Sequence, residues 1–481
     1  MKDRVNQDIG TKGPRLDWDD IDWQLIEKRI KNLRQRIFRA TKCGKWNQVR
    51  SLMKLMLRSH SNLLHSVRKV TQQNKGRKTP GIDRQRVLTA RGRANLARQM
   101  SKYHAWKVRP AKRIYIPKAG GKQRPLGILT IKNRVAQAIV KNALEPSWEA
   151  RFEPNSYGFR PGRSCHDAIQ HCWLRFKKSS KNRWLLDADL KGAFDNIHHN
   201  FILDRLGNAP GRELIRQWLK AGYVEAESLH ATTSGVQQGG VISPLLANIA
   251  LDGLQSLLGN AGYIRYADDF LVTANTFEEI QILVPLVENF FAERVLMLNT
   301  TKTKVVSILD GFNFLGFNVR TYKGKCIIKP QKEKVFKLLR EIRDWLRCHR
   351  TIPVEAVISH LNPILRGWGN FYKHVNSKQV FDYVDHQVWL AIWRWCVRRH
   401  PKKSKDWVFR RYFRTLKGRK WIFFSKVRDY LSGELTEVYL TKVSAIPIKY
   451  HVKVVRSASP DDPVLQDYWQ KRSTKGRYQR E

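Results

Sequence analysis

The sequence predicts an α+β protein, because strand-like and helix-like periodicity alternate along much of the chain. Between 112 and 128, charged and apolar side chains alternate, turn at Gly120-Gly121 and resume, which indicates a β-hairpin with a basic tip. The runs "RWLLDADLKGAFDNI" and "GYIRYADDFLV" are typical of short buried strands, and helical patterns occupy 201–220 and 243–258 between them. Strands and helices mixed on this scale favour an α+β fold.

Composition indicates a folded protein with a polyanionic partner. The 481 residues are 42% hydrophobic, enough for a sizeable core, and 90 Lys+Arg against 41 Asp+Glu leave a formal net charge of +49. Phosphate contacts release counterions, so this charge favours nucleic acid well above a membrane surface. A purely structural binder, of the ribosomal or histone-like kind, is the alternative that charge alone leaves open.

Cysteines and apolar runs exclude several other classes. None of the six cysteines forms a C-x-x-C pair, so we expect reduced thiols in a cytosolic protein and no cysteine-based zinc site. Met1 is followed by charged residues, and no run of 18 or more apolar residues occurs, so neither secretion nor membrane spanning is expected.

The first elements are predicted to be two amphipathic helices. Ile26, Ile30, Leu33 and Ile37 define one, which Asp19 or Asp20 could cap and which could end at Gly44. A second pattern runs over 49–70, before the turn-rich stretch 74–83. The opposite face of this second helix is basic. Its charges are either a solvated surface or, as the overall charge favours, an RNA contact: Arg50, Lys54, Arg58, Arg68 and Lys69.

Strand signals fade after Pro330, where we place a domain boundary near 325–332. From there to about 421 the chain is predicted to be helical, tryptophan-rich and basic, and most of its tryptophans are expected to be core residues. The segment 432–481 has strand character at "EVYLTKV" and "IPIKYHVKVV" and ends in a basic tail. Within the helical segment that ends near 421, the basic residues expected to contact RNA are Lys402, Lys403, Lys405, Arg410 and Arg411.

Four aspartates are the candidate metal-binding and catalytic residues. Asp268 and Asp269 interrupt an apolar run near an expected hairpin tip, where their mutual repulsion would be offset by a divalent cation. Asp187 and Asp189 are two apart, so both project from one strand face and either could meet the pair. Carboxylates suit Mg²⁺, and three of them beside a polyanion suggest two-metal phosphoryl or nucleotidyl transfer. An isolated Asp-Asp pair is more often a turn or a helix cap.

Taken with these acids, the remaining motifs resemble a known family. In chain order they are "NKGRKTPGID", "IPKAGGKQRPLGI", "SYGFRPGRSCHDAI", "DADLKGAFDNI", "GVQQGGVISPLLANI", "YADD", "LNTTKTKV", "FNFLGF" and "RGWGNFYKH". Over roughly 20–470 the chain resembles bacterial group II intron-encoded reverse transcriptases with maturase activity, of the kind lacking a C-terminal nuclease domain.

The resemblance implies an architecture. It is a right-hand polymerase with fingers and a palm built on an antiparallel sheet, then a helical thumb, also called maturase domain X, and a small DNA-binding segment. The expected limits are 1–85 for an N-terminal helical extension, 86–328 for fingers and palm, 329–421 for the thumb and 422–481 for the DNA-binding segment.

The same resemblance implies roles for individual residues. Asp189, Asp268 and Asp269, with the backbone carbonyl of Leu190, would hold two Mg²⁺ ions, for which Mn²⁺ could substitute. Phe194 would exclude a ribose 2′-hydroxyl. The residues expected at the nucleotide or the primer phosphates are Lys118, Arg124, Gln238 and Lys302. Gln237 departs from the family, since a proline is common there, and this could loosen the loop.

The implied function is RNA-directed DNA synthesis together with maturase activity. Expected partners are group II intron RNA, target DNA, a primer strand and dNTPs, in a bacterial cytoplasm near RNA or nucleoid; the splicing chemistry would belong to the RNA. Two alternatives stay open: a splicing-only RNA-binding protein with an idle polymerase fold, and a reverse transcriptase of a retron or defence system.

Overall fold

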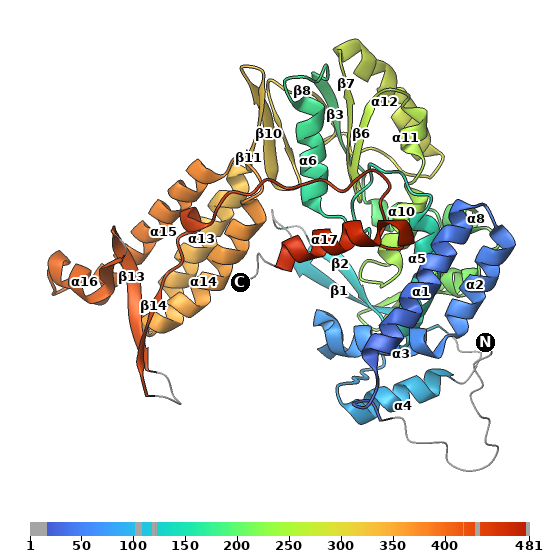
Figure 1. Cartoon of the computed structure of the whole chain (residues 1–481), viewed down its shortest axis with the longest axis horizontal. Coiled ribbons are helices and arrows are strands. Elements are labelled where there is room, and N and C mark those ends of the chain that lie inside the picture. Colours follow the sequence, from blue (N-terminus) through green and yellow to red (C-terminus); the bar gives the residue numbers. More distant parts are fainter. Residues whose placement is uncertain are drawn as a thin grey trace.

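The computed structural model describes residues 17–101, 108–117, 121, 123–416, 418–428 and 433–477 (Figure 1). It opens with a helical layer: α1 (Trp23–Lys42), α2 (Trp46–Arg58), α3 (His60–Arg68) and, after a π-helical turn at Lys69–Gln73, α4 (Ala90–Ser101). Two expectations were wrong in detail. Asp22, not Asp19 or Asp20, caps α1 by accepting a hydrogen bond from Leu25 N at 3.0 Å. The predicted second helix breaks at Ser59, whose hydroxyl caps α3 instead.

The predicted hairpin is confirmed. Strand β1 (Ala111–Pro117) pairs antiparallel with β2 (Gln123–Ile128), while residues 118–120 and 122 at the expected tip lie outside the described residues. On its other side β1 pairs in parallel with β4 (Tyr223–Glu225), which pairs with β5 (Ser228–His230). The sheet order β2-β1-β4-β5 therefore places the hairpin beside a segment that follows it by about a hundred residues.

A second four-stranded sheet carries the acids. Its order is β6-β7-β3-β8, from β3 (Trp184–Asp189), β6 (Gly262–Tyr266), β7 (Asp269–Ala274) and β8 (Lys304–Ser307), and every pairing is antiparallel. Helix α6 (Cys165–Phe176) packs on β6, and α12 (Phe277–Ala292) packs on β3 and β7 (Figure 1). Leu185, Leu186 and Ala188 of β3 and residues 270–272 of β7 are buried between these helices, as the apolar runs predicted.

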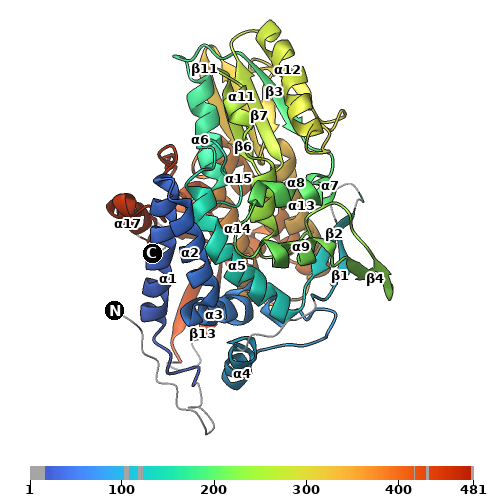
Figure 2. The same cartoon turned by 90° about the vertical axis from the view of Figure 1, so that its right-hand side faces the viewer.

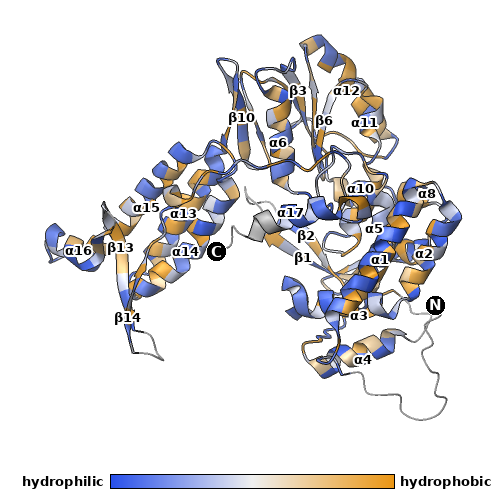
Figure 3. Ribbon diagram, viewed as in Figure 1, coloured by the Kyte–Doolittle hydropathy of each residue, from blue (hydrophilic) through white to orange (hydrophobic). Residues whose placement is uncertain are grey.

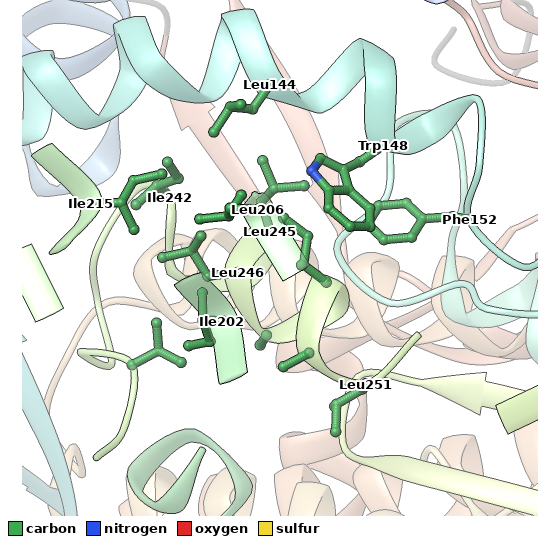
Figure 4. Packing of buried hydrophobic residues seen from close by; sticks show 14 of the residues in the cluster. Leu144, Trp148, Phe152, Ile202, Leu206, Ile215, Ile242, Leu245, Leu246 and Leu251 are labelled. Atoms are coloured by element: carbon green, nitrogen blue, oxygen red, sulfur yellow. The ribbon is translucent and has the colours of Figure 1, made fainter. Parts of the chain in front are cut away.

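Below this sheet lies a helical core. Its helices are α5 (Ile131–Glu149), α7 (Ala193–Asn196), α8 (His199–Leu206), α9 (Arg212–Lys220) and α10 (Ser243–Ala250), whereas the short helix α11 (Leu254–Leu257) lies next to α12 (Figure 1). Figure 4 shows Leu144 and Trp148 of α5 facing Leu206 and Leu245, and each such buried side chain contributes about 1.5–3 kcal/mol of transfer free energy. Among the described helices, none is both long and apolar enough to cross a membrane.

The C-terminal half begins with a small sheet, β9 (Phe312–Phe314), β10 (Phe317–Tyr322) and β11 (Lys325–Pro330), followed by a helical bundle. The bundle comprises α13 (Lys332–Cys348), α14 (Val354–Tyr372), α15 (Lys378–Arg399) and α16 (Lys405–Tyr412). Figure 3 shows both hydrophilic and hydrophobic stretches along α13 and α14, as amphipathic packing requires. All six cysteines are unpaired.

The chain is not helical to 421 as expected. Strand β12 (Phe413–Leu416) starts directly after α16 and pairs with β13 (Arg419–Arg428), which pairs with β14 (Leu435–Tyr439). Gly418 adopts φ +74° in the connection, and Phe413 and Phe423 are buried at register partners. The hairpin forms because burying these aromatic partners outweighs the weak local helical pattern.

The final segment returns from the bundle to the front of the molecule, and we call residues 446–477 the C-terminal strap (Figure 1). The strand expected at 446–455 does not form. Its backbone instead bonds to other elements, for example Lys449 N to Lys373 O at 2.9 Å, and the expected tail contains helix α17 (Gln466–Arg477) beside α1 (Figure 2).

Polar contacts at three acidic residues hold the strap. Buried Asp167 of α6 accepts hydrogen bonds from Val454 N at 2.8 Å and Arg472 Nη2 at 3.1 Å, and His451 Nε2 lies 2.9 Å from it. Burial alone would raise the pKa of Asp167, but His451 and the hydrogen bond from Val454 N hold it at about 2. The other two contacts pair strap acids with α1: Asp461 with Arg34 at 2.7 Å and Asp462 with Lys42 at 2.8 Å.

Candidate active site

Three of the acids singled out in the sequence meet at one end of the β6-β7-β3-β8 sheet. The register of β3 and β7 places Asp189 directly opposite Asp269. Tyr266 pairs with Asp269, so Ala267 and Asp268 form a two-residue turn between β6 and β7, and Ala267 takes φ +59°. The strand therefore tolerates adjacent acids because they occupy its end and a turn, facing the end of β3.

The turn is supported from below by a buried arginine and a close backbone contact. The Arg265 side chain, 1% exposed, donates from Nη1 to Asn248 Oδ1 at 3.1 Å and to Ala267 O at 3.4 Å. A Cβ on Gly158 would lie 2.3 Å from Ala267 N, so only glycine fits there. Asn248 Nδ2 also bonds Gly158 O at 2.9 Å, which ties the glycine to the same support.

The acids repel one another in a partly desolvated setting. Burial, followed by the charges of Asp268 and Asp189, raises the pKa of Asp269 to about 7. Burial also raises the pKa of Asp268, and burial with the Asp189 charge raises that of Asp187 to about 6. The site thus carries fewer negative charges near neutral pH than its composition suggests, and it favours an added cation.

Asp189 already has cationic and amide partners. Lys302 Nζ lies 2.5 Å and Asn299 Nδ2 3.3 Å from Asp189 Oδ2, and Asn299 N bonds Asp189 O at 2.8 Å. Sequence reasoning placed Lys302 near primer phosphates; the structure places it on the carboxylate. This contact raises the pKa of Lys302. Asn299 was not singled out, although it is the second residue of the motif "LNTTKTKV".

A divalent cation fits the donor types but not the arrangement of the side chains as they stand. Within the described ranges, no three His, Cys, Asp or Glu side chains are positioned to hold a metal. The oxygen donors and the raised pKa values nevertheless suit a hard cation. To bind the cation, Asp189 Oδ2 would have to release Lys302 Nζ, its present partner. Leu190, whose carbonyl the resemblance assigns to the metal, is buried after β3 and forms an isolated bridge with Leu298.

A pocket of about 460 Å³ has Phe194, Asp195, Gln238 and Gly127 among its lining residues. Arg124 Nε donates to Gln238 Oε1 at 2.7 Å, and Gln238 Nε2 donates to Asp195 Oδ2 at 3.0 Å. Asp195 was missed by sequence reasoning, although it directly follows Phe194 in "KGAFD". Lys118, the other predicted phosphate contact, lies outside the described residues.

The loop that carries Gln238 is closely packed despite Gln237 in place of proline. Gly127 N donates to Gln238 O at 2.7 Å, and a Cβ on Gly127 would lie 2.7 Å from Gln237 Cγ. The side chain of Gln237 thus fills the space above this glycine, which fixes the loop against β2.

The predicted RNA-binding residues of the N-terminal helices differ in their surroundings. Arg50, Lys54 and Arg58 are exposed on α2. Arg68 lies 4.3 Å over the Trp23 ring and pairs with Glu27 at 3.3 Å. Lys69 has its pKa lowered by partial burial and by Lys141. The first three are therefore the more available contacts for phosphate.

Near the bundle's end, Lys402, Lys403, Lys405 and Arg411 are exposed, and Arg410 pairs with Asp406 at 2.9 Å. A second basic feature was missed. A cavity of about 680 Å³ lies between the C-terminal ends of α13 and α15, and we call it the arginine groove after its residues: Arg343, Arg347, Arg350, Arg394, Arg398 and Arg399. Local patterns show arginines on each helix, but only packing brings the two sets together.

Three protein families match the chain. "N-terminal domain of reverse transcriptase" matches residues 18–100, "Reverse transcriptase (RNA-dependent DNA polymerase)" matches 116–319, and "Group II intron, maturase-specific domain" matches 335–413. The second match contains all three converging acids and, apart from Arg113, the residues that line the pocket. The third contains most of α13, all of α14 and α15, and the arginine groove.

Several curated proteins are similar to parts of the chain. Protein YkfC of Escherichia coli strain K12 is 32% identical over 309 residues, covering 54% of this chain and 81% of YkfC. An uncharacterized 91 kDa protein in a cob intron of Schizosaccharomyces pombe is 26% identical, covering 56% of this chain but 44% of that protein. The group II intron-encoded protein LtrA of Lactococcus lactis subsp. cremoris is 42% identical over 154 residues, covering 31% of this chain and 25% of LtrA.

Proposed function

This chain belongs to the group II intron-encoded reverse transcriptases and maturases, and we propose that Asp189, Asp268 and Asp269 form its DNA polymerase site. The observation that carries the proposal is the register that sets Asp189 opposite Asp269, with Asp268 in the adjoining turn. These carboxylates, with the Leu190 carbonyl, would hold two Mg²⁺ ions. When bound, the ions would lower the pKa of a primer 3′-hydroxyl and neutralise the triphosphate.

The surrounding side chains then bind and select the nucleotide. Arg124 and Lys118 would contact the triphosphate, and Lys302 would be free for phosphate once Asp189 has another cation. Gln238, held between Arg124 and Asp195, would support the incoming nucleotide from the pocket floor. Phe194, 9% exposed at the pocket wall, would contact the sugar and exclude a 2′-hydroxyl.

Primer extension tests this proposal directly. With a poly(rA) template, an oligo(dT) primer, dTTP and Mg²⁺, we expect a ladder of products that EDTA abolishes. Tight RNA binding without any extension would instead support the splicing-only alternative. A copurifying RNA with no group II intron structure would support a retron or defence-system enzyme.

Mg²⁺ should stabilise the protein more at pH 8 than at pH 6. The pKa of Asp269, about 7 in the fold, lies above its ordinary value of 3.8, so protonation favours the metal-free fold, and this stabilisation is lost as pH rises through 7. Between pH 6 and 8 the loss for one group is about 1.4 kcal/mol. Because Mg²⁺ binds the ionised form, its shift of Tm should grow over the same interval.

The matched control is Asp269→Asn, which keeps the side-chain shape and removes the charge. Its metal-free Tm should depend less on pH, and its response to Mg²⁺ should be small at both values. Equal Mg²⁺ shifts at pH 6 and pH 8 in the unsubstituted protein would contradict the assignment of Asp269 as a metal ligand.

We further propose that the protein binds structured group II intron RNA, assists its splicing and copies it into DNA at a target site during retrohoming. The exposed arginine and lysine residues of α2 and α16, and the arginine groove, would contact its phosphates. Arginine suits this because its planar fork binds phosphate in a bidentate manner. Target DNA, its primer strand and dNTPs are the other proposed partners.

Neutralising the groove should weaken RNA binding and flatten its dependence on salt. Arg394→Gln with Arg398→Gln removes two charges from the groove while leaving the contacts of Arg347 with Asp344 and of Arg399 with Ile352 O intact. Loss of two phosphate contacts should reduce the slope of log K against log [salt] by about 2. The matched control is Lys178→Gln with Lys181→Gln, an equal charge change near the start of β3. Equal slopes for the two variants would place the RNA elsewhere.

A further inference from the structure

Phe159 is an unusual residue in the loop before α6. Its ring is 52% exposed, and its backbone takes φ +58°, in the left-handed region that bulky side chains rarely adopt. Neither property is expected of a residue that only fills a core. A strained, exposed aromatic persists only where the surrounding structure holds it, and such residues gather at functional sites.

Both neighbours of Phe159 are fixed. Gly158 packs on Ala267 of the acidic turn, and its carbonyl accepts the hydrogen bond from Asn248. Arg160 is fully paired with Glu149, with Nη2 to Oε2 at 2.9 Å and both side chains 1% exposed. Upstream, Tyr157 N bonds Arg265 O at 2.8 Å, next to the same turn. The loop therefore ties the position of Phe159 to the turn that carries Asp268.

The ring of Phe159 meets the proposed sugar gate. Its centroid lies 6.2 Å from that of Phe194, with the planes at 89°, an edge-to-face pair. The gate itself is anchored through its backbone, since Phe194 O accepts a hydrogen bond from Val236 N at 2.6 Å. The hydrogen bond fixes the backbone position of Phe194, and the ring contact restricts the rotamer of its side chain.

We propose that Phe159 is a positioning residue for sugar selection: its ring braces Phe194 so that the gate cannot turn away from an incoming 2′-hydroxyl. The proposal rests on the proposed role of Phe194 as the gate. An added oxygen is rejected by contact only if the wall it meets is rigid. Without the brace, Phe194 can move to another rotamer and ribonucleotides gain access, while deoxyribonucleotides, which make no such clash, are used as before.

The experiment compares kcat/KM for dTTP and UTP on a poly(rA) template. In Phe159→Ala, the dTTP-to-UTP ratio should fall about three- to tenfold, the size expected from losing one aromatic pair, chiefly through a higher kcat/KM for UTP. Phe159→Tyr keeps the ring and should restore the ratio. Phe159→Gly removes the ring but relieves the backbone strain, so its Tm should exceed that of Phe159→Ala while its ratio falls equally.

Phe194→Ala tests the role of Phe194 as the gate separately from the role of Phe159 as its brace. If Phe194→Ala leaves the ratio unchanged, the gate assignment itself fails. If Phe194→Ala lowers the ratio and Phe159→Ala does not, the gate stands and the brace is wrong. In the double variant, the ratio should match that of Phe194→Ala alone, because a brace has no effect without its gate. An equal loss of kcat/KM for both nucleotides in Phe159→Ala, with an unchanged ratio, would also overturn the inference.

Discussion

Asp268→Ala should abolish DNA synthesis, lowering the rate of primer extension by about 10³-fold or more, while RNA affinity stays within about twofold. The carboxylate lies in the turn opposite the end of β3, and its charge raises the pKa of Asp269. Removing it takes away one of the three proposed carboxylate ligands of the metal ions without touching the arginine groove or α2. Single-nucleotide incorporation and filter binding to structured RNA measure the two quantities separately.

Asp187→Asn is the matched control, because Asp187 shares a strand face with Asp189 but pairs in register with Leu271 and Lys304 rather than with Asp269. We expect it to retain most of the activity. If Asp187→Asn is as damaging as Asp189→Asn, the metal ligands have been assigned to the wrong pair. Parallel loss of RNA binding and synthesis in Asp268→Ala, with a lowered Tm, would indicate misfolding rather than a catalytic defect.

Glu149→Gln should cost about 3–5 kcal/mol of unfolding free energy, because it leaves the Arg160 guanidinium buried without its carboxylate. Three Arg160–Glu149 hydrogen bonds of 2.9–3.2 Å join the end of α5 to the loop that carries Phe159. A lowered midpoint in urea, with an unchanged slope, is the expected measurement.

The surface pair of Arg216 with Glu213, at 2.8 Å, gives the comparison. Glu213→Gln breaks an ion pair of similar length in full solvent, and the midpoint should hardly move. A change of similar size in both variants would mean that burial does not govern the strength of the Arg160–Glu149 pair.

Local signals in the sequence predicted the features that lie closest together along the chain. The alternation over 112–128 identified the β1–β2 hairpin, and the apolar runs around Asp189 and Asp268 identified two strands of the acidic sheet. Each of these depends on side-chain period and turn residues within about twenty positions. The domain limits and the roles of individual residues stay predictions.

Features that depend on distant partners were missed or misplaced. Strands form after Phe413 because their aromatic side chains are buried together, which a helical period over α13–α16 cannot reveal. The segment 446–455 alternates like a strand but bonds to Asp167 and Lys373 instead of a sheet. The contacts of Asp195 with Gln238 and of Lys302 with Asp189 span 43 and 113 positions. Local periodicity does not specify which distant residues make such contacts.

The C-terminal strap connects the helical bundle back to the N-terminal helices. The chain passes from the acidic sheet through the small sheet β9–β11 into the bundle, and the strap returns from the bundle to α1, where Arg34 and Lys42 hold Asp461 and Asp462. Swinging the bundle outward would therefore require breaking both ion pairs or pulling Val454 and Arg472 away from Asp167. A movement of the bundle that admits or releases a polynucleotide would therefore change the contacts of α1, near the other end of the chain.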